Sequence, residues 1–440
     1  MNSRTWTVIG VIAVLALCAL CLGALILGAY AVASGFYITN VIRSPSEANV
    51  EVSEEEQLSF EVEVPATLEI TNQFGEIEVQ AAPENTGTIE VTIAKSAFGV
   101  DQAQAEERLA ELQVDVEESP NRVALRVTEP GFDRGSRPGN VDFTVAVPRQ
   151  TTVVIDSNTG RITLTGTSGK ADLHSDFGEI RVNDFTGGLS ARTGSSSIIV
   201  RRVDLLPDGN GDVTLTASFG EITLEDTNTG QLVVESGSGQ VTLTNVHSSG
   251  EARLESDFGE IDWRTGSATR VTLNVGSGLV RLSDMLVDGE LQVESNFGEI
   301  RLTGVEAQGY RLTSGSGMIS ADLVRGQVIA RSQQNDVRIT GGEEATLDLE
   351  SGTGQLIYRG SLGPGPHRLE TNFGDIQIGL PQDSAFDVDL ETNFGTLESE
   401  FEIDLSTSSD EKRWTGSVNG GGDVITASTQ NGSISLDAIP

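Results

Sequence analysis

The chain of 440 residues has two cysteines, three histidines and few aromatic side chains. Both cysteines, Cys18 and Cys21, lie near the N-terminus, so the rest of the chain can form neither a disulfide nor a thiolate metal site. The histidines, His174, His247 and His367, are scattered, and none lies in a motif with an acid or a nucleophile. Cysteine chemistry is therefore excluded beyond the N-terminal segment, and histidine-based catalysis has little support.

Basic residues are also few. The sequence has 28 Lys and Arg against 65 Asp and Glu, which gives a formal net charge of −37 at pH 7. Nucleic acids and anionic lipids bind to cationic surfaces, so neither is expected as a partner. Such a charge is typical of a solvated, soluble surface. A surface that collects divalent cations is the alternative interpretation.

Charged residues are absent from Thr5 to Ile42, and Val8 to Ala33 is almost wholly apolar. A helix that crosses a bilayer needs about 20 apolar residues, so this run predicts a transmembrane helix after a short cytoplasmic stub. Arg4 precedes the run and Glu54 to Glu56 follow it, which places the N-terminus inside and nearly everything else outside a cytoplasmic membrane. A signal peptide cleaved near Ala31 to Ala33 is the alternative.

A repeat dominates the remainder of the chain. The sequence Ser-Asp-Phe-Gly-Glu-Ile at 175–180 returns with small changes at 217–222, 256–261, 295–300 and 371–376. Between these copies lies a version with Ser or Thr in place of Phe, at 236–241, 314–319 and 351–356. Most steps between the motif glycines are 18 to 21 residues, a period that indicates stacked coils.

Two steps between the motif glycines are longer, from 178 to 220 and from 317 to 354. The second contains a degenerate copy of the motif, with Asn335 at the glycine position. The first contains the Ser-rich sequence Gly194-Ser-Ser-Ser197, which we interpret as a coil corner and not as a nucleophile elbow, because no helix pattern follows it. We also expect this step to hold an extra loop that bulges from the array.

The alternation within one repeat predicts which side chains are buried. Leu291, Val293 and Ser295 alternate with polar residues, so this face of a strand is expected to point inward. Phe297 continues the alternation, and we expect Phe and Ser to alternate at one inward corner of successive coils. Gly298 would turn the corner, because a positive φ costs glycine no steric strain. The motif is thus predicted to be a packing device.

These patterns divide the chain into five segments. Residues 1–43 contain the cytoplasmic stub and the transmembrane helix, and residues 44–64 are an acidic stalk. Residues 65–150 are a small α+β N-terminal cap, in which Asp101 to Leu112 is the one convincing helix, with Asp101 and Gln104 as its capping pair. Residues 151–380 are the β-solenoid repeats, and residues 381–440 are the C-terminal coils and their cap.

Three further sequences are informative together with the Ser-x-x-Gly-x-Ile units. They are Gly-Glu-Ile-Glu-Val at 75–79, Val-Asp-Phe-Thr-Val-Ala-Val-Pro at 141–148 and Ile-Thr-Ala-Ser-Thr-Gln-Asn-Gly-Ser-Ile-Ser-Leu at 425–436. In this order they resemble the bacterial candidate-adhesin family defined by domain of unknown function 4097. The resemblance implies an all-β, parallel β-solenoid, expected to be right-handed, in a protein of the bacterial envelope. It implies no catalytic residue.

One loop is a candidate calcium site. In Asp208-Gly-Asn-Gly-Asp212, the residues Asp208, Asn210 and Asp212 stand at alternate positions, as in the opening of a calcium loop. Val213 and Phe219 stand where such a loop requires Gly and Glu. An ordinary turn rich in Gly, Asn and Asp explains the same residues and is the alternative.

The motif acids are a second candidate. If equivalent positions stack, Glu221, Glu260 and Glu299 lie on one edge about 10 Å apart, which is too far for neighbouring carboxylates to share one ion. They predict a solvated edge that blocks lateral strand pairing.

We therefore expect a binding or scaffold module and not an enzyme: an adhesin-like, surface-exposed solenoid, anchored in the bacterial cytoplasmic membrane by its N-terminal helix. Its partner would be a cell-surface glycan or an envelope protein, and calcium is the one candidate ion. An extracytoplasmic regulatory or envelope-stress component is the second hypothesis. A polysaccharide-processing enzyme is the third, because parallel β-helices host such enzymes, although that argument is analogy alone.

Overall fold

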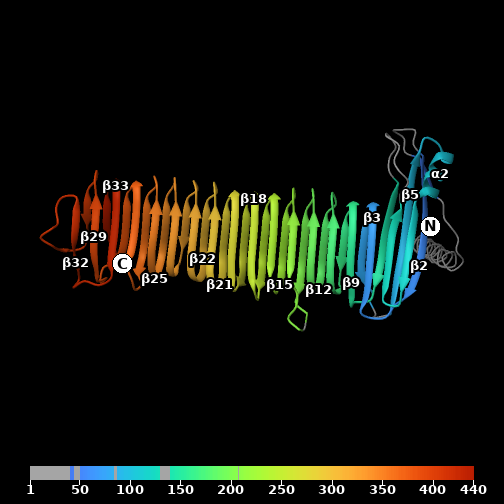
Figure 1. Ribbon diagram of the computed structural model, residues 1–440, viewed down its shortest axis with the longest axis horizontal. Helices are drawn as coiled ribbons and strands as arrows, with labels where there is room; N and C mark the ends of the chain where they lie inside the picture. Colours follow the sequence, from blue (N-terminus) through green and yellow to red (C-terminus); the bar gives the residue numbers. More distant parts are fainter. Residues whose placement is uncertain (1–39, 44–49, 84–86, 129–138, 207) are drawn as a thin grey trace, which may run out of the picture.

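The computed structural model describes residues 40–43, 50–83, 87–128, 139–206 and 208–440. They form a long rod in which strands run across the axis and successive coils stack along it (Figure 1). Neighbouring coils pair in parallel, so the predicted all-β solenoid is confirmed. The predicted transmembrane helix lies outside the described residues. Of the segment 1–43 to which it was assigned, only strand β1 (Asn40–Arg43) is described. Within the described part of the chain, no helix is long and apolar enough to cross a membrane.

One coil shows the plan of the rod. Strand β18 (Glu251–Phe258) reaches a corner at Gly259, and β19 (Ile261–Ala268) follows on a second side of the rod. The chain then returns to the first side as β20 (Arg270–Ser277), which pairs with β18 in parallel register. Alternate side chains of these strands point inward and are fully buried, such as Leu254 and Ile261. The core is therefore a continuous apolar column along the axis.

Equivalent strands stack on the same side of the rod. The first side also contains β9 (Thr151–Thr159), β11 (Ser168–Ser175), β14 (Val213–Ala217), β16 (Leu232–Ser238), β24 (Arg325–Ser332) and β27 (His367–Phe373). The second side contains β10 (Ile162–Thr165), β13 (Ile198–Asp204), β15 (Ile222–Thr229), β17 (Val241–Ser248), β23 (Ile319–Asp322), β26 (Leu356–Leu362) and β28 (Ile376–Pro381). Four longer strands run from the second side into the first side of the next coil: β12 (Ile180–Thr193), β21 (Val280–Ser295), β22 (Ile300–Ser314) and β25 (Val337–Ser351).

The N-terminal end of the rod contains the antiparallel pairs and the helix. Strands β2 (Val50–Glu61), β5 (Thr88–Gly99) and β8 (Asn140–Val147) pair in antiparallel fashion, as do β6 (Gln113–Ser119) and β7 (Arg122–Thr128). Strands β3 (Ala66–Phe74) and β4 (Ile77–Ala81) link them to β9 and β10. Residues 50–61 are thus part of the sheet, where the sequence suggested a stalk. Strand β2 carries enough alternating inward residues, such as Val52, to pack.

The one predicted soluble helix is present as α2 (Gln102–Glu111). The Asp101 side chain accepts a hydrogen bond from the Gln104 amide at 2.9 Å, and the Gln104 side chain accepts one from the Val100 amide. Ala105 and Leu109 are buried, and the helix packs against β5 and β2.

The C-terminal end has an order that differs from the sequence. Strands β29 (Phe386–Thr392) and β30 (Leu397–Ser399) come before β33 (Val424–Asn431) and β34 (Ile434–Ile439) in the chain. In space, β33 lies between β27 and β29, and β34 lies between β28 and β30. The connection includes β31 (Asp404–Leu405) and β32 (Arg413–Val418), which pairs in antiparallel fashion with β29. The last coil of the sequence is therefore inserted inside the stack.

The long glycine step from 178 to 220 contains a complete coil as well as a loop. The Ser195 amide donates to the Asp176 carbonyl at 2.9 Å, and the Phe219 amide donates to the Gly194 carbonyl at 3.0 Å. A coil with Ser195 and Ser196 at its corner thus lies between the two motif copies. The expected loop follows it and projects from the rod between the labels β12 and β15 (Figure 1). Asn335 occupies the predicted corner of the other long step.

Many of the corners are held by a buried hydroxyl. The Ser314 hydroxyl accepts a hydrogen bond from the Gly317 amide at 2.8 Å and donates one to the Gly298 carbonyl of the preceding coil at 3.0 Å. The same donation to the preceding corner is made by Thr193, Ser332, Ser351, Thr371, Thr392 and Thr429. This relay explains why most copies of the motif begin with Ser or Thr, and it links these coils to their neighbours. Ala217 and Val275 stand at the same position in their coils and have no hydroxyl to contribute.

Glycine is needed at these corners mainly because neighbouring backbones approach closely. A Cβ added to Gly298 would lie 1.6 Å from the Gly278 carbonyl oxygen, a distance that no side chain could relieve. The φ of Gly298 is not in the left-handed region, in contrast to our prediction, whereas Gly278 has φ 142°. The close stacking, and not a positive φ, excludes other residues at Gly298.

Candidate binding surface

The motif phenylalanines form a row of exposed aromatic rings. We call six of them the phenylalanine ridge: Phe177, Phe219, Phe258, Phe297, Phe373 and Phe394. Their exposed fractions lie between 56% and 75%. The prediction that these rings point inward is therefore wrong, and the motif is more than a packing device. Exposed apolar side chains that gather in one place are a feature of binding surfaces.

The ring at Phe297 points outward at a corner that a hydroxyl closes, and Phe219 is exposed in the same way at a corner that begins with Ala217. Ser295 is the last inward residue of its strand, and its hydroxyl accepts the Gly298 amide at 2.8 Å. This bond closes a tight turn, so the alternation of the strand stops at Ser295. Asn296 and Phe297 then lie on the outside of the turn, where Phe297 is 74% exposed. The inward alternation resumes only at Ile300.

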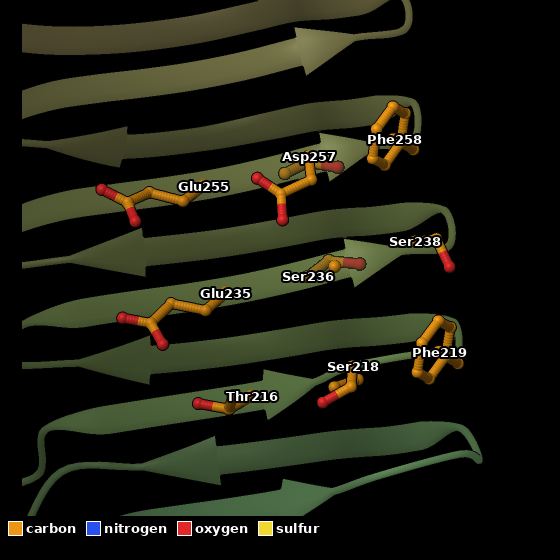
Figure 2. A pocket seen from close by; sticks show the side chains of 12 residues that line it. Thr216, Ser218, Phe219, Glu235, Ser236, Ser238, Glu255, Asp257 and Phe258 are labelled. Carbon is orange, nitrogen blue, oxygen red and sulfur yellow. The ribbon is translucent and has the colours of Figure 1, made fainter.

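The ridge has a period of two coils. Phe258 stands in register with Ser238 of one neighbouring coil and with Ser277 of the other. Since paired strands lie about 4.8 Å apart, rings two coils apart are separated by about 10 Å along the rod. Phe297 and Phe373 are the exception, because four coil steps separate their corners. Figure 2 shows Phe219 and Phe258 projecting from the same corner, with the small Ser238 between them.

Polar side chains line the surface beside these two rings. The hollow between Phe219 and Phe258 is also lined by Glu235, Glu255 and Asp257 (Figure 2). Glu235 and Asp257 are exposed, and within the described residues neither has an ion-pair partner. The Glu255 carboxylate accepts a hydrogen bond from Arg253 at 2.9 Å. The hollow thus combines two aromatic walls with acceptor oxygens on one flank.

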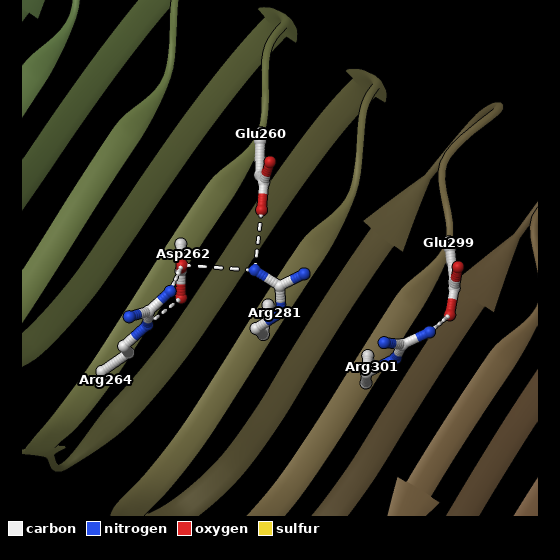
Figure 3. Close-up of polar contacts among 6 residues, drawn as sticks. All are labelled: Glu260, Asp262, Arg264, Arg281, Glu299 and Arg301. Carbon is white, nitrogen blue, oxygen red and sulfur yellow. Dashed lines mark hydrogen bonds and ion pairs between the residues drawn. The ribbon is translucent and has the colours of Figure 1, made fainter.

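Most motif acids on the other flank are neutralised by arginines. Arg281 lies 2.9 Å from the Glu260 carboxylate and 3.3 Å from that of Asp262, as Figure 3 shows. Asp262 is almost completely buried, and its hydrogen bond raises the pKa of Arg264. The edge that was predicted as a row of solvated acids thus also contains arginines that pair with these acids.

The other two predicted edge acids differ from each other. Glu299 pairs with Arg301 at 2.5 Å (Figure 3), whereas Glu221 is exposed and its backbone carbonyl accepts the Ile198 amide. The arginines were not anticipated from the sequence, although Arg281 follows Glu260 by about one repeat.

The three residues of the predicted calcium loop each have a contact in the structure. Both carboxylate oxygens of Asp208 accept hydrogen bonds from Asn210, one from its backbone at 3.1 Å and one from its side chain at 2.8 Å. The Asp212 carboxylate accepts the Gln231 amide of the next coil at 2.8 Å. These contacts describe a turn tied to the rod. Calcium binding by Asp208, Asn210 and Asp212 stays a prediction.

The histidines have separate environments. His174 lies 3.0 Å from Asp156 and 3.4 Å from Asp176, on neighbouring coils, and it is partly exposed. His247 contacts Ser267 at 2.9 Å. His367 is fully buried, and this burial lowers its pKa. The structure does not bring the three together.

A comparison with known protein families identifies the family of this chain. The family model described as Toastrack DUF4097 matches residues 66–283 and 261–437. The chain belongs to this family. The two Toastrack matches together include nearly all of the rod, both the exposed ridge and the corners that support it. Among curated proteins, none matches this chain.

Two solved structures are similar to this Toastrack protein. A candidate cell adhesion protein from Clostridium sporogenes is 8% identical, with a TM-score of 0.15, and the match covers 88% of this chain and 100% of that one. A candidate adhesin from Bacteroides fragilis is 12% identical, with a TM-score of 0.24, and the match covers 69% of this chain and 96% of that one. Likenesses at these scores are too weak to place residues.

Proposed function

We propose that this protein is a surface-exposed binding module of the bacterial envelope, anchored in the cytoplasmic membrane by the apolar run near its N-terminus. The observation that carries the proposal is the phenylalanine ridge. Six large apolar side chains remain exposed along one corner of the rod, although each stands next to a fully formed core. Packing alone gives no reason for Phe there, because the coils between have Ser, Thr, Gln or Asn at the same corner, such as Ser238 and Asn431.

The remainder of the architecture supports a binding role over catalysis. A solenoid holds its corners in a fixed order along one axis, so a repeated ligand can contact many equivalent positions at once. The names of the two similar solved structures, both candidate adhesion proteins, agree with such a role. The uncharged run from Thr5 to Ile42 supports the anchor, and the acidic residues that follow it support an exterior location for the rod.

The proposal is tested with the full chain produced in a bacterium. Protease added to intact cells should degrade the rod, and cells with the chain should attach to surfaces coated with isolated cell envelopes. A matched control lacks residues 8–33 and should neither be cut from outside nor increase attachment. Full protection of the chain in intact cells, with cleavage only after lysis, would contradict the proposal.

A further inference from the structure

We infer that the phenylalanine ridge is the binding site for an extended β-linked glycan whose sugars are neutral or carry free amines. The inference rests on the proposed binding function and names the surface and the class of ligand. It is carried by three observations: the period of the rings, the small and polar residues around them, and the charge beside them.

The period of the ridge matches a polymer. From Phe177 to Phe297 a ring is present on every second coil without a break, so the rings repeat at about 10 Å. An extended β-linked glycan repeats each disaccharide over nearly this length and presents the same face of every second sugar. Each ring can then stack on the C–H face of one sugar in two. A globular partner would need no such period.

The residues between the rings suit a sugar chain. Ser238 and Ser277 are small, so a chain that rests on the rings meets no obstruction between them. Thr216, Glu235 and Asp257 line the hollow beside Phe219 and Phe258, where their oxygens can accept hydrogen bonds from sugar hydroxyls or amines (Figure 2). Amines would gain further attraction from the carboxylates and from the ring faces.

The charge decides between this ligand and its competitors. Glu235 and Asp257 have no ion-pair partner within the described residues, so an acidic polysaccharide would be repelled. A second copy of the chain could place its rings between these, about 5 Å from each neighbour, within the range that aromatic pairs prefer. That arrangement would also bring two rows of unpaired carboxylates together. A neutral or amine-bearing glycan has no such cost.

The test uses the purified full-length chain in mild detergent. The probes are β-1,4-linked hexamers and dimers of N-acetylglucosamine and of glucosamine, with polygalacturonate as the anionic probe. Binding is measured by calorimetry. The hexamers should bind more tightly than the dimers because they span more rings, and polygalacturonate should not bind. The double variant Phe219→Ser with Phe258→Ser should weaken hexamer binding at least about fivefold.

Two controls make the result specific. Serine already occupies this corner on alternate coils, so the double variant should fold, and its unfolding temperature should equal that of the parent. Leu286→Ser removes an apolar side chain that is 50% exposed on another part of the rod, and it should leave hexamer binding unchanged.

Several outcomes would overturn the inference. These are equal hexamer binding by the double variant and the parent, binding of polygalacturonate alone, and a ridge-dependent dimer without glycan binding. If cells with the double variant attach to envelopes as well as the parent cells do, the assignment of the ridge as the glycan site is overturned while the proposed function stands. If the chain binds glycan through the ridge but stays inside the cell, the proposed function fails while the assignment of the ridge as the glycan site stands.

Discussion

The hydroxyl relay predicts that the first residue of the motif, and not its phenylalanine, maintains the rod. Ser314→Ala removes a fully buried hydroxyl that accepts from the Gly317 amide and donates to the Gly298 carbonyl. Both backbone groups lose a buried partner, at about 1–3 kcal/mol each. We expect the free energy of unfolding to fall by about 2–4 kcal/mol, after some relaxation of the corner. In a stack of coils the damage is concentrated at one interface, so unfolding should begin there.

The assay is equilibrium unfolding in urea, followed by circular dichroism of the strands. Ser316→Ala is the matched control, because Ser316 lies at the same corner and its hydroxyl makes no hydrogen bond within the described residues; its effect should stay within about 0.5 kcal/mol. Ser314→Thr should be tolerated, since Thr371 makes the same bond at 3.0 Å. The reasoning is refuted if Ser314→Ala unfolds at the same urea concentration as the parent while Phe297→Ser does not.

Three further predictions concern single positions. Thr265 is an exposed β-branched residue with φ 55°, so Thr265→Asn should stabilise the rod by about 1 kcal/mol, and an unchanged urea midpoint would argue against strain there. Burial lowers the pKa of His367. As the pH falls below about 6.5, His367 binds a proton in the unfolded chain but not in the folded chain, so the free energy of unfolding should drop by up to about 1.4 kcal/mol per pH unit. The variant His367→Gln should remove this pH dependence, and the variant His174→Gln should leave it in place. Millimolar calcium should raise the unfolding temperature only if Asp208 and Asp212 bind it, and Asp208→Asn should then abolish the shift.

The sequence predicted the features that depend on short-range order. The glycine period indicated the stacked coils, because most corners lie so close to a neighbouring backbone that they leave no room for a Cβ, as at Gly298. Helix α2 was predicted within a residue, because its capping bond joins Asp101 and Gln104. The coil corner at Gly194 to Ser197 was also predicted, although serine replaces both Phe and Gly of the motif there.

Features that depend on long-range contacts or on the turn itself were not predictable. Strand alternation placed Phe297 inside, yet the hydrogen bond from Gly298 to Ser295 ends the alternation two residues earlier. The insertion of β33 between β27 and β29 leaves no signal in the sequence, because Thr371, Thr429 and Thr392 can each stack on any neighbouring corner. The repeated phenylalanines could therefore be identified in the sequence, but their exposure to solvent could not be predicted from it.

Hydroxyl-radical footprinting of the full-length chain, with and without a β-1,4-linked hexamer of glucosamine, tests the central claim most directly. Phe219, Phe258 and Phe297 should be oxidised in the free chain and protected when the hexamer is bound. Phe143 and Phe185 are fully buried and should stay unmodified in both states. Ridge rings that resist oxidation in the free chain, or that are oxidised equally with the hexamer present, would contradict the account.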